Sequence, residues 1–415
     1  MLHYMLSVFT LLILFFFAYI KLRYPFWNNQ PVYHSYDILR KLCREPFIVN
    51  SNKPRKTKFY EPVFVKTKEY INIRNDSKEH LLNAIQCFYI STDRILHTIK
   101  KEDVNAYLTG QSELSYVSIY YDRYYEQLCD LSGSRIVTNY SPVGCITSRK
   151  LNFWYVNYSS QHKTNYTEMP IYFIDYLCVD RSKNQTATYR KLLQSHEYNC
   201  RIENPGISCS LIKKEIELFD GIVPFVKYDT YTYKLRDNSI PKLPPHYYTI
   251  QLTGENLDNY IDFFYSNNDY CSKTKLYDVL VFPDIGNIQQ LISQKLLYIY
   301  CLKSKTNIYG FYFFKDANMY YEDMDMNTLQ FSASVMNCLS PMIFYTGYVH
   351  SLQDILKKDK TKTMMLFENI GHNSIILKEW SKKYSPIFTN KTAYYNYNFV
   401  HPYSPMPLNR VFILN

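Results

Sequence analysis

The clearest feature in the pattern of apolar and polar positions lies at the start of the chain. Residues 5–20, MLSVFTLLILFFFAYI, carry no charged side chain. With the apolar residues beside it, this run approaches the roughly 20 residues that a helix needs to cross a bilayer. A cleaved signal peptide would have a basic start and small residues near the cleavage point. Only His3 precedes this run and Lys21 follows it, so we expect a retained transmembrane helix over residues 1–22.

Two sequence features bear on the orientation of this helix, and they disagree. Basic residues follow the run at Lys21, Arg23, Arg40, Lys41 and Arg44. The positive-inside rule then places the bulk of the chain in the cytoplasm. Asn-x-Ser/Thr sequons, which favour the opposite side, begin at Asn75, Asn139, Asn157, Asn165, Asn184 and Asn390. Because an Asn-rich chain contains such matches by chance, we predict a single-pass membrane protein with a cytoplasmic body.

After this segment, the spacing of apolar residues alternates between that of helices and that of strands. Apolar positions at helical spacing predict a helix over 78–108. From about residue 134 the residues become β-branched and aromatic, and Pro142-Val143-Gly144 predicts the turn of a hairpin. The nearly continuous apolar run at 171–179 predicts a buried strand, and residues 181–196 read as the start of a helix.

The second half repeats this plan in outline. Three Pro residues within DNSIPKLPP predict a linker at 237–245. The elements expected after it are a helix over 252–266, a hairpin of 296–304 with 308–316, a strand at 361–369 and a helix at 374–384. Although no residue-level repeat is visible, the shared order predicts two related α+β units, 23–236 and 237–415.

Composition narrows the class of partner. The formal net charge is +10, which suits an anionic partner such as a nucleotide or a phospholipid surface. Lys and Arg form no run of five, so we predict no nucleic-acid binding. None of the ten Cys residues forms a Cys-x-x-Cys pair, which argues against a zinc ribbon. Scattered Cys in a large chain are typical of a reducing, intracellular compartment.

Common catalytic signatures are missing from the sequence. His196-Glu197 lacks the second His of a zinc-protease helix, and no Gly-x-Ser-x-Gly elbow occurs. Direct attack by a substrate amine, which needs no protein nucleophile, is the economical chemistry to consider. Asp323-Met324-Asp325 could hold a metal ion for a glycosyltransferase acting on a nucleotide sugar; a solvated acidic turn is the alternative interpretation.

The junction LCVDRSKNQTATYRKLL, residues 177–193, joins the predicted strand to the predicted helix. Free N–H groups and the positive dipole end at a helix N-terminus suit a phosphate. Small or polar side chains at 182 and 184–186 leave those N–H groups accessible, and Arg181 and Lys183 add positive charge. Many such turns bind nothing, so phosphate binding needs further support.

That support comes from a resemblance. YPFWNNQPV at 24–32 looks like the start of the N-myristoyltransferase family, and FIDYLCVD at 173–180 is similar to its Glu-Ile-Asn-Phe-Leu-Cys-Val-His strand. VGCITSRKLNFWY, from 143, resembles the hairpin that precedes this strand. MLFENIGHNSIILKEWSKKYSPIF and AYYNYNF resemble the family's late segments, and RVFILN resembles its apolar end. The matches keep their order from residue 24 to 415.

The resemblance implies two tandem halves of the GNAT type and transfer of a myristoyl group from its CoA thioester to an N-terminal glycine amine. No cofactor or metal is implied beyond acyl-CoA as co-substrate. Main-chain N–H groups of Tyr176 and Leu177 would form the oxyanion hole, and the terminal carboxylate of Asn415 would be the general base. Acyl-CoA would contact Phe26, Trp27, Cys178, Val179, Asn184, Gln185, Thr186, Ala187 and Thr188.

The sequence departs from the family at several positions. The family's basic loop is replaced by residues 184–190, so CoA binding depends on N–H groups, Arg181, Lys183 or Arg190. The family's Asn in the FIDYLCVD strand is Asp175 here. Of the carboxylates that bind the peptide in the family, this chain keeps one in the first acidic segment, Asp93, and has Thr389 where the family has an Asp in its C-terminal loop. The acyl-CoA side is therefore better supported than the peptide side.

Three alternatives remain beside a membrane-anchored myristoyltransferase. One is a GNAT-fold enzyme that uses another acyl-CoA or another amine. The second is a non-catalytic membrane-anchored protein that keeps the fold. The third is the metal-dependent glycosyltransferase. Measured acyl transfer separates the first from the second, and the fold decides on the third.

Overall fold

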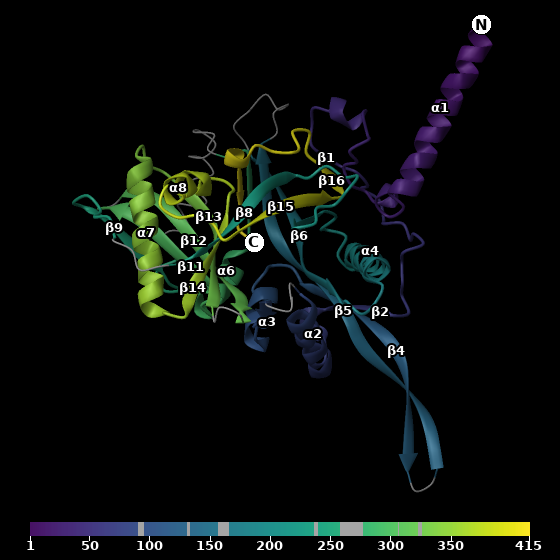
Figure 1. The fold of residues 1–415 in the computed structure, drawn as a ribbon, viewed down its shortest axis with the longest axis horizontal. Helices are drawn as coiled ribbons and strands as arrows, with labels where there is room; N and C mark the ends of the chain where they lie inside the picture. Colours follow the sequence, from purple (N-terminus) through teal and green to yellow (C-terminus); the bar gives the residue numbers. More distant parts are fainter. Residues whose placement is uncertain are drawn as a thin grey trace.

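The computed structural model describes residues 1–89, 95–130, 133–156, 166–235, 240–257, 277–305, 307–322 and 326–415. Its first element, α1 (Leu2–Arg23), is a continuous helix that projects away from the body of the molecule (Figure 1). The segment His3–Arg23 is long and apolar enough to cross a membrane, with a mean hydropathy of 2.2. A signal sequence near the N-terminus would have the same properties, so the helix is confirmed and the membrane anchor stays a prediction.

The body is organised around one sheet, which has 15 strands within the described residues. Its main path runs β17-β10-β5-β6-β7-β15-β8-β14-β13-β12-β11-β9, with β2 on β4, β4 on β5 and β3 on β12. The bounds are β2 Val65–Glu69, β3 Ile95–His97, β4 Tyr116–Asp130, β5 Gly133–Val156, β6 Tyr166–Val179, β7 Ser210–Glu215, β8 Val226–Lys234, β9 Tyr247–Leu252, β10 Val279–Phe282, β11 Leu297–Ser304, β12 Asn307–Tyr321, β13 Met326–Met336, β14 Lys362–Glu368, β15 Phe388–Tyr397 and β17 Val411–Ile413. A separate pair joins β1 (Phe47–Ile48) to β16 (Phe399–Val400).

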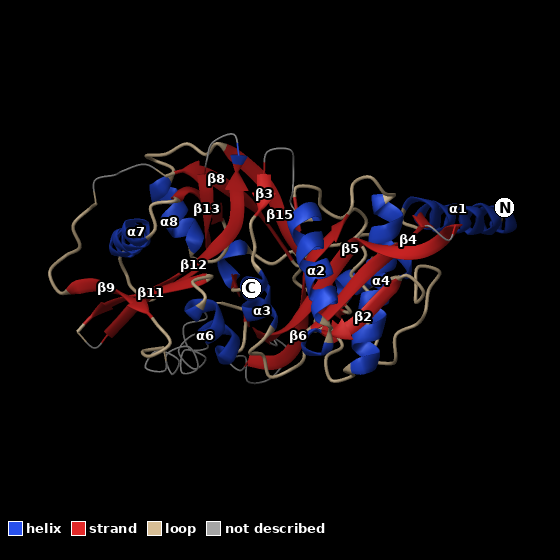
Figure 2. Ribbon diagram, turned by 90° about the horizontal axis from the view of Figure 1, so that it is seen from below, coloured by secondary structure: helices blue, strands red, loops and turns tan. Residues whose placement is uncertain are grey.

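Helices cover this sheet in separate groups. The helices of the body are α2 Asn75–Phe88, α3 Lys101–Leu108, α4 Gln185–Glu203, α6 Ile285–Ser293, α7 Pro341–Lys358 and α8 Asn373–Trp380. α2 packs on β5 and β6, and α4 packs on β2, β4, β5 and β6 (Figure 2). α7 packs on β9, β11 and β12, while α8 contacts α7 and β13. The result is the mixed α and β architecture expected from the sequence.

Strands from the end of the chain are inserted among strands of the first half. β15 lies between β7 and β8, and β10 joins β5 to β17. One sheet therefore continues across the expected boundary near residue 237. The described part of the linker, from Ile240, has no helix or strand before β9. The division into units 23–236 and 237–415 stays a prediction.

Two local expectations are wrong. The helix expected over 78–108 is α2, β3 and α3 in succession, because Tyr89 is extended after α2 and Ile95–His97 pair with β12. The turn expected at Pro142-Val143-Gly144 does not occur: β5 continues through it and stays paired with β4. The register shifts there, so Val143 is the extra residue of a β-bulge, which tolerates the missing N–H of Pro142.

The other expected elements are found. The strand at 171–179 lies in β6, α4 follows it, and β11 and β12 form the hairpin. β14 and α8 match the late strand and helix. The expected helix over 252–266 lies mostly outside the described residues; its described part, Leu252–Leu257, ends β9 and continues in turns. The Asp323-Met324-Asp325 segment, the possible metal site, lies wholly outside them.

Candidate active site

The geometry of the site begins with an irregularity in β6. The pairs Cys145 with Cys178 and Thr147 with Asp175 leave two residues of β6, Tyr176 and Leu177, opposite the single residue between Cys145 and Thr147. Tyr176 has a φ of 48°, a conformation that a bulky residue rarely adopts. Such a bulge turns main-chain N–H groups away from the ladder. The predicted oxyanion donors therefore lie at a break in the sheet's hydrogen bonding.

A glycine allows the neighbouring strand to approach this bulge. A Cβ on Gly144 would lie 2.7 Å from the main-chain oxygen of Cys178, closer than a carbon and an oxygen pack. The Pro-Val-Gly motif therefore does not form a turn. Its glycine allows β5 to pack closely against the bulged strand β6.

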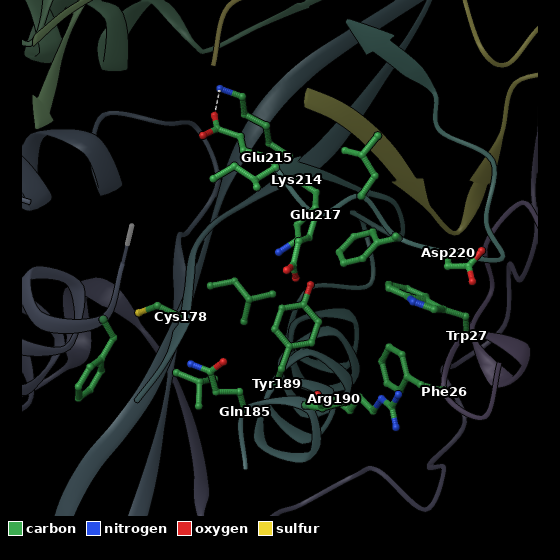
Figure 3. Close-up of a pocket in the computed structure, with 18 of the residues that line it drawn as sticks. Phe26, Trp27, Cys178, Gln185, Tyr189, Arg190, Lys214, Glu215, Glu217 and Asp220 are labelled. Atoms are coloured by element: carbon green, nitrogen blue, oxygen red, sulfur yellow. Dashed lines mark ion pairs between the residues drawn. The ribbon is translucent and has the colours of Figure 1, made fainter. Parts of the chain in front are cut away.

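A cavity of about 730 Å³ opens on one side of the bulge. Figure 3 shows some of its walls, with Trp27 and Tyr189 on either side of the space and Arg190 beside Phe26. The rings of Phe26 and Trp27 lie 4.9 Å apart, and Trp27 lies 4.7 Å from Phe219. The volume falls in the range typical of small-molecule sites.

The structure brings most of the predicted acyl-CoA residues to this cavity. Those that line it are Phe26, Trp27, Cys178, Val179, Gln185 and Thr186, and Leu177, a predicted oxyanion donor, lies among them. Asn184, Ala187 and Thr188 do not line it. Asn184 instead caps α4, since its side chain accepts from the N–H of Ala187 at 3.2 Å, and Thr188 is buried.

The N-terminal turn of α4, where phosphate binding was predicted, lines this cavity through Gln185 and Thr186. Arg181 and Arg190 both line the cavity. Lys183 does not, because its ammonium pairs with Asp122 at 2.8 Å. Of the three cations on which CoA binding was predicted to depend, two thus line the cavity near the start of α4, where the helix dipole also favours an anion.

A smaller cavity of about 100 Å³ lies on the other side of the bulge. Asp175, Tyr176 and Asn415 all line it, so Asn415 shares this cavity with one of the two predicted oxyanion residues. Asn415 is only 5% exposed, and it is carried there by β17, which pairs with β10. Tyr89, Lys213 and Glu215 line both cavities, which therefore share a wall.

The carboxylate of Asp175 is held by three donors. The hydroxyls of Tyr89 and Tyr107 donate to it at 2.8 Å and 2.6 Å. The main-chain N–H of Tyr176 donates at 2.8 Å. Burial raises the pKa of both tyrosines, so they stay protonated and keep donating. One of the two predicted oxyanion donors thus already has a partner, which no sequence pattern indicated.

Lys213 and Lys315 line the smaller cavity together with the carboxylates of Glu215, Asp103, Asp175 and Asp316. Lys213 pairs with Glu215 at 2.8 Å and with Glu368 at 2.6 Å. Burial disfavours the charged lysine, but Glu215 and Glu368 outweigh it and hold the pKa of Lys213 well above its usual value. Lys315 donates to the main-chain oxygen of Asn415 at 2.6 Å.

The pKa of Lys315 shifts in the opposite direction to that of Lys213. Burial, with repulsion from Arg149 and Lys213, lowers the pKa of Lys315 to about 8. A lysine that titrates near neutral pH therefore contacts the end of the chain. The sequence did not single out Lys213, Lys315, Tyr89 or Tyr107, because they come from four elements that only the fold brings together.

The candidate site therefore consists of a bulged strand between a large cavity and a small one. A comparison with protein-family models found no match, and a comparison with curated protein sequences found none either. Solved structures do match. A structure of Saccharomyces cerevisiae N-myristoyltransferase with bound myristoyl-CoA superposes with a TM-score of 0.63 at 13% identity, covering 91% of this chain and 93% of that one.

Two further yeast structures agree with this result. One with bound myristoyl-CoA gives a TM-score of 0.64 at 12% identity, covering 90% of this chain and 87% of that one. One with bound myristoyl-CoA and inhibitors gives 0.63 at 13% identity, covering 92% of both chains. This protein therefore has the fold of the N-myristoyltransferases over nearly its whole length, as the resemblance implied.

Proposed function

We propose that this protein is a membrane-anchored acyltransferase that moves a myristoyl group from CoA to the amine of an N-terminal glycine. The observation that carries the proposal is the pair of cavities that meet at the β6 bulge. One has the lining expected for an acyl-CoA, and the other contains the end of the chain. The fold supports acyl transfer in general, while the acyl length and the acceptor belong to the proposal.

In this proposal the large cavity binds acyl-CoA. The CoA moiety contacts Phe26 and Trp27, and its phosphates lie at the N–H groups of Gln185 and Thr186 between Arg181 and Arg190. The thioester then lies at the bulge, near Leu177 and Cys178. An acyl chain gains about 0.8 kcal/mol for each CH₂ that it buries, so a long chain is favoured if it extends into the sheet.

The reaction needs no protein nucleophile. The carboxylate of Asn415 takes a proton from the acceptor's ammonium, which frees the nitrogen lone pair to attack the thioester carbon. The carbonyl oxygen becomes an oxyanion beside the N–H groups of Tyr176 and Leu177. The C–S bond then breaks, and CoA leaves as a thiolate that takes up the proton lost by the new amide nitrogen. Each preorganised donor to an oxyanion is worth roughly 10²–10³ in rate.

Two carboxylates are available to an incoming ammonium. The Asn415 carboxylate is the proposed general base, and Lys315 orients it. Asp175 lines the same cavity and binds the acceptor's positive charge before the proton is lost. The Tyr176 N–H serves the oxyanion once the carboxylate of Asp175 turns from it towards the ammonium.

The second candidate function is that of a non-catalytic protein that keeps the fold. The donation of the Tyr176 N–H to Asp175 favours it, because an oxyanion hole with a permanently occupied donor is a weak catalyst. A third, a GNAT-type enzyme with another acyl-CoA or amine, shares the geometry and differs only in specificity.

One assay separates these candidates. The full chain, purified in detergent, is incubated with acyl-CoAs of increasing length and a glycine-initiated peptide, and release of the CoA thiol is followed. The proposal expects release that depends on the peptide and is fastest near the myristoyl length. Release with another length or another amine would support the third candidate, and binding without release would support the second.

The membrane anchor has its own test. We propose that α1 spans a membrane with the body in the cytoplasm, where acyl-CoA is available. Protease protection and glycosylation mapping in intact membranes decide this. Glycans on Asn75 or Asn390 would place the body on the other side and contradict the proposed orientation.

A further inference from the structure

A third cavity lies apart from the two at the bulge. It has a volume of about 460 Å³ and no lining residue in common with either of them. Its walls come from Asn28–Pro31, from the segment after β1 and from α4. Since α1 ends at Arg23, the first of these walls follows closely on the proposed membrane helix. The cavity would therefore open near the bilayer surface.

Positive charge dominates this cavity. Arg40, Lys53, Arg55 and Arg201 line it, and no Asp or Glu does. Arg40 pairs with Asp37 at 2.8 Å outside the lining, and Arg201 donates to the main-chain oxygens of Asn50 and Asn52. Within the described part of the chain, Lys53 and Arg55 form no ion pair. Lys53 and Arg55 thus add cationic charge that no ion pair within the described structure neutralises.

A buried imidazole adds a second observation. His34 is 8% exposed and lines the cavity, and its Nδ1 has no hydrogen-bond partner within the described structure. Burial, with repulsion from Arg40, lowers the pKa of His34 to about 4, so the ring is neutral at physiological pH. A buried polar nitrogen without a partner is costly unless a ligand or water satisfies it.

The remaining walls are suited to hydroxyl groups. Asn28, Asn29, Asn52 and Gln194 line the cavity. The Asn28 Oδ1, the Asn29 Nδ2 and the Gln194 Oε1 already have protein partners, so a ligand hydroxyl would meet the other end of each of these amides. Arginine guanidinium groups match phosphate oxygens in a bidentate manner. Cations with amides, rather than an apolar lining, select a ligand that is both anionic and rich in hydroxyls.

We infer that this cavity binds a phosphorylated polyol. The ligand's phosphate would lie between Lys53 and Arg55, with its hydroxyls on the amides and one of them on Nδ1 of His34. Such a group occurs as a lipid headgroup at the membrane surface or as a soluble phosphate ester. Both sources share the same recognition chemistry, which is independent of acyl transfer.

The test uses the full chain in phosphatidylcholine nanodiscs and a fluorescent inositol trisphosphate as probe. We expect saturable binding that unphosphorylated inositol does not compete. Lys53→Ala and Arg55→Ala should each weaken binding roughly 10-fold or more, since each removes charged hydrogen bonds. The matched controls are Lys58→Ala and Arg44→Ala, which remove the same charges from exposed positions outside the cavity and should bind like the wild type.

Probe binding is then compared in two kinds of nanodisc, one with and one without a phosphoinositide in the bilayer, to distinguish the two sources of ligand. If a phosphoinositide added to the bilayer lowers the apparent affinity for the probe, the lipid headgroup occupies the cavity; if it does not, the ligand is soluble. Either result supports the site. The inference is overturned if the probe does not bind or if the cavity and control variants weaken binding equally. It is also overturned if CoA displaces the probe from the wild-type protein whereas unlabelled phosphorylated inositols do not. Acyl-transfer activity does not enter any of these outcomes.

Discussion

Replacement of Asp175 by Asn tests how the carboxylate and the oxyanion hole share the bulge of β6. The change keeps the size of the side chain but removes its charge. Its oxygen can still accept from Tyr89 and from the Tyr176 N–H, whereas the new NH₂ group faces Tyr107, whose hydroxyl must turn to accept. The three contacts therefore remain possible but become neutral.

The expected magnitude follows from these three hydrogen bonds. A bond to a charged partner contributes about 1 kcal/mol more than a neutral one, so the variant loses about 2–3 kcal/mol over the three contacts. About 1 kcal/mol of this is the weaker hold on the Tyr176 N–H. If that donor must be released before it meets the acyl oxygen, kcat should rise roughly 5-fold.

The same variant should bind its acceptor less well, because the ammonium loses one of two carboxylates. We therefore expect kcat to rise and the acceptor KM to rise with it, while acyl-CoA affinity stays unchanged. Steady-state kinetics with myristoyl-CoA and a glycine-initiated peptide measure all three quantities, and thermal melting checks that the variant is folded. A fall in kcat of about 10²–10⁴ would refute this reasoning, since a loss of that size is typical of removing a general base.

Three further predictions follow from the same geometry. Trp27→Ala should weaken acyl-CoA binding by about 10-fold or more, because its ring forms a cavity wall against Phe219; calorimetry in detergent measures this, with Tyr19→Ala in α1 as control, and an unchanged affinity would favour a membrane-interface role for Trp27. Lys315→Met should slow acyl transfer below pH 8, where the protonated lysine orients the Asn415 carboxylate, and should have less effect above it, because the pKa of Lys315 is lowered to about 8. The ratio of variant to wild-type rates across pH checks this, and a ratio independent of pH would contradict it. Extension of the chain by a few residues after Asn415 should lower the rate of acyl transfer roughly 10²–10⁴-fold and leave acyl-CoA binding intact. Rate and binding assays on the extended protein measure both quantities.

The elements most visible in the sequence were those whose pattern is local. The buried strand at 171–179, the helix after it and the hairpin of β11 and β12 have a clear period and clear ends. The helix over 78–108 was wrong because the pairing of Ile95–His97 with β12 depends on residues more than 200 positions away. Tertiary pairing overrides local propensity in such segments.

The Pro-Val-Gly segment failed as a turn for a related reason. Its residues are typical of turns, but a Pro is tolerated at a bulge and a Gly where another backbone approaches. Both conditions apply at Pro142 and Gly144, and both depend on a partner strand. Sequence alone does not distinguish a turn glycine from one that admits a neighbouring strand.

The candidate site shows the same division. Residues within recognisable motifs, such as Trp27, Cys178 and Thr186, line the expected cavity. Residues whose role depends on the folded neighbourhood were missed or misplaced. The carboxylate of Asp175 accepts from the main-chain N–H of Tyr176 and from two tyrosine hydroxyls, Tyr89 just after α2 and Tyr107 within α3, and the linear sequence does not reveal these contacts.

The most direct test of the proposed function is to locate the transferred group on the acceptor. The full chain in detergent is incubated with myristoyl-CoA and a glycine-initiated peptide, and the product is fragmented in a mass spectrometer. A matched peptide with an acetylated N-terminus serves as control, because it offers no free α-amine. The account predicts one myristoyl group on the α-nitrogen of the glycine and none on the control. Acylation of both peptides at a side chain, or no acylation with intact myristoyl-CoA binding, would contradict it.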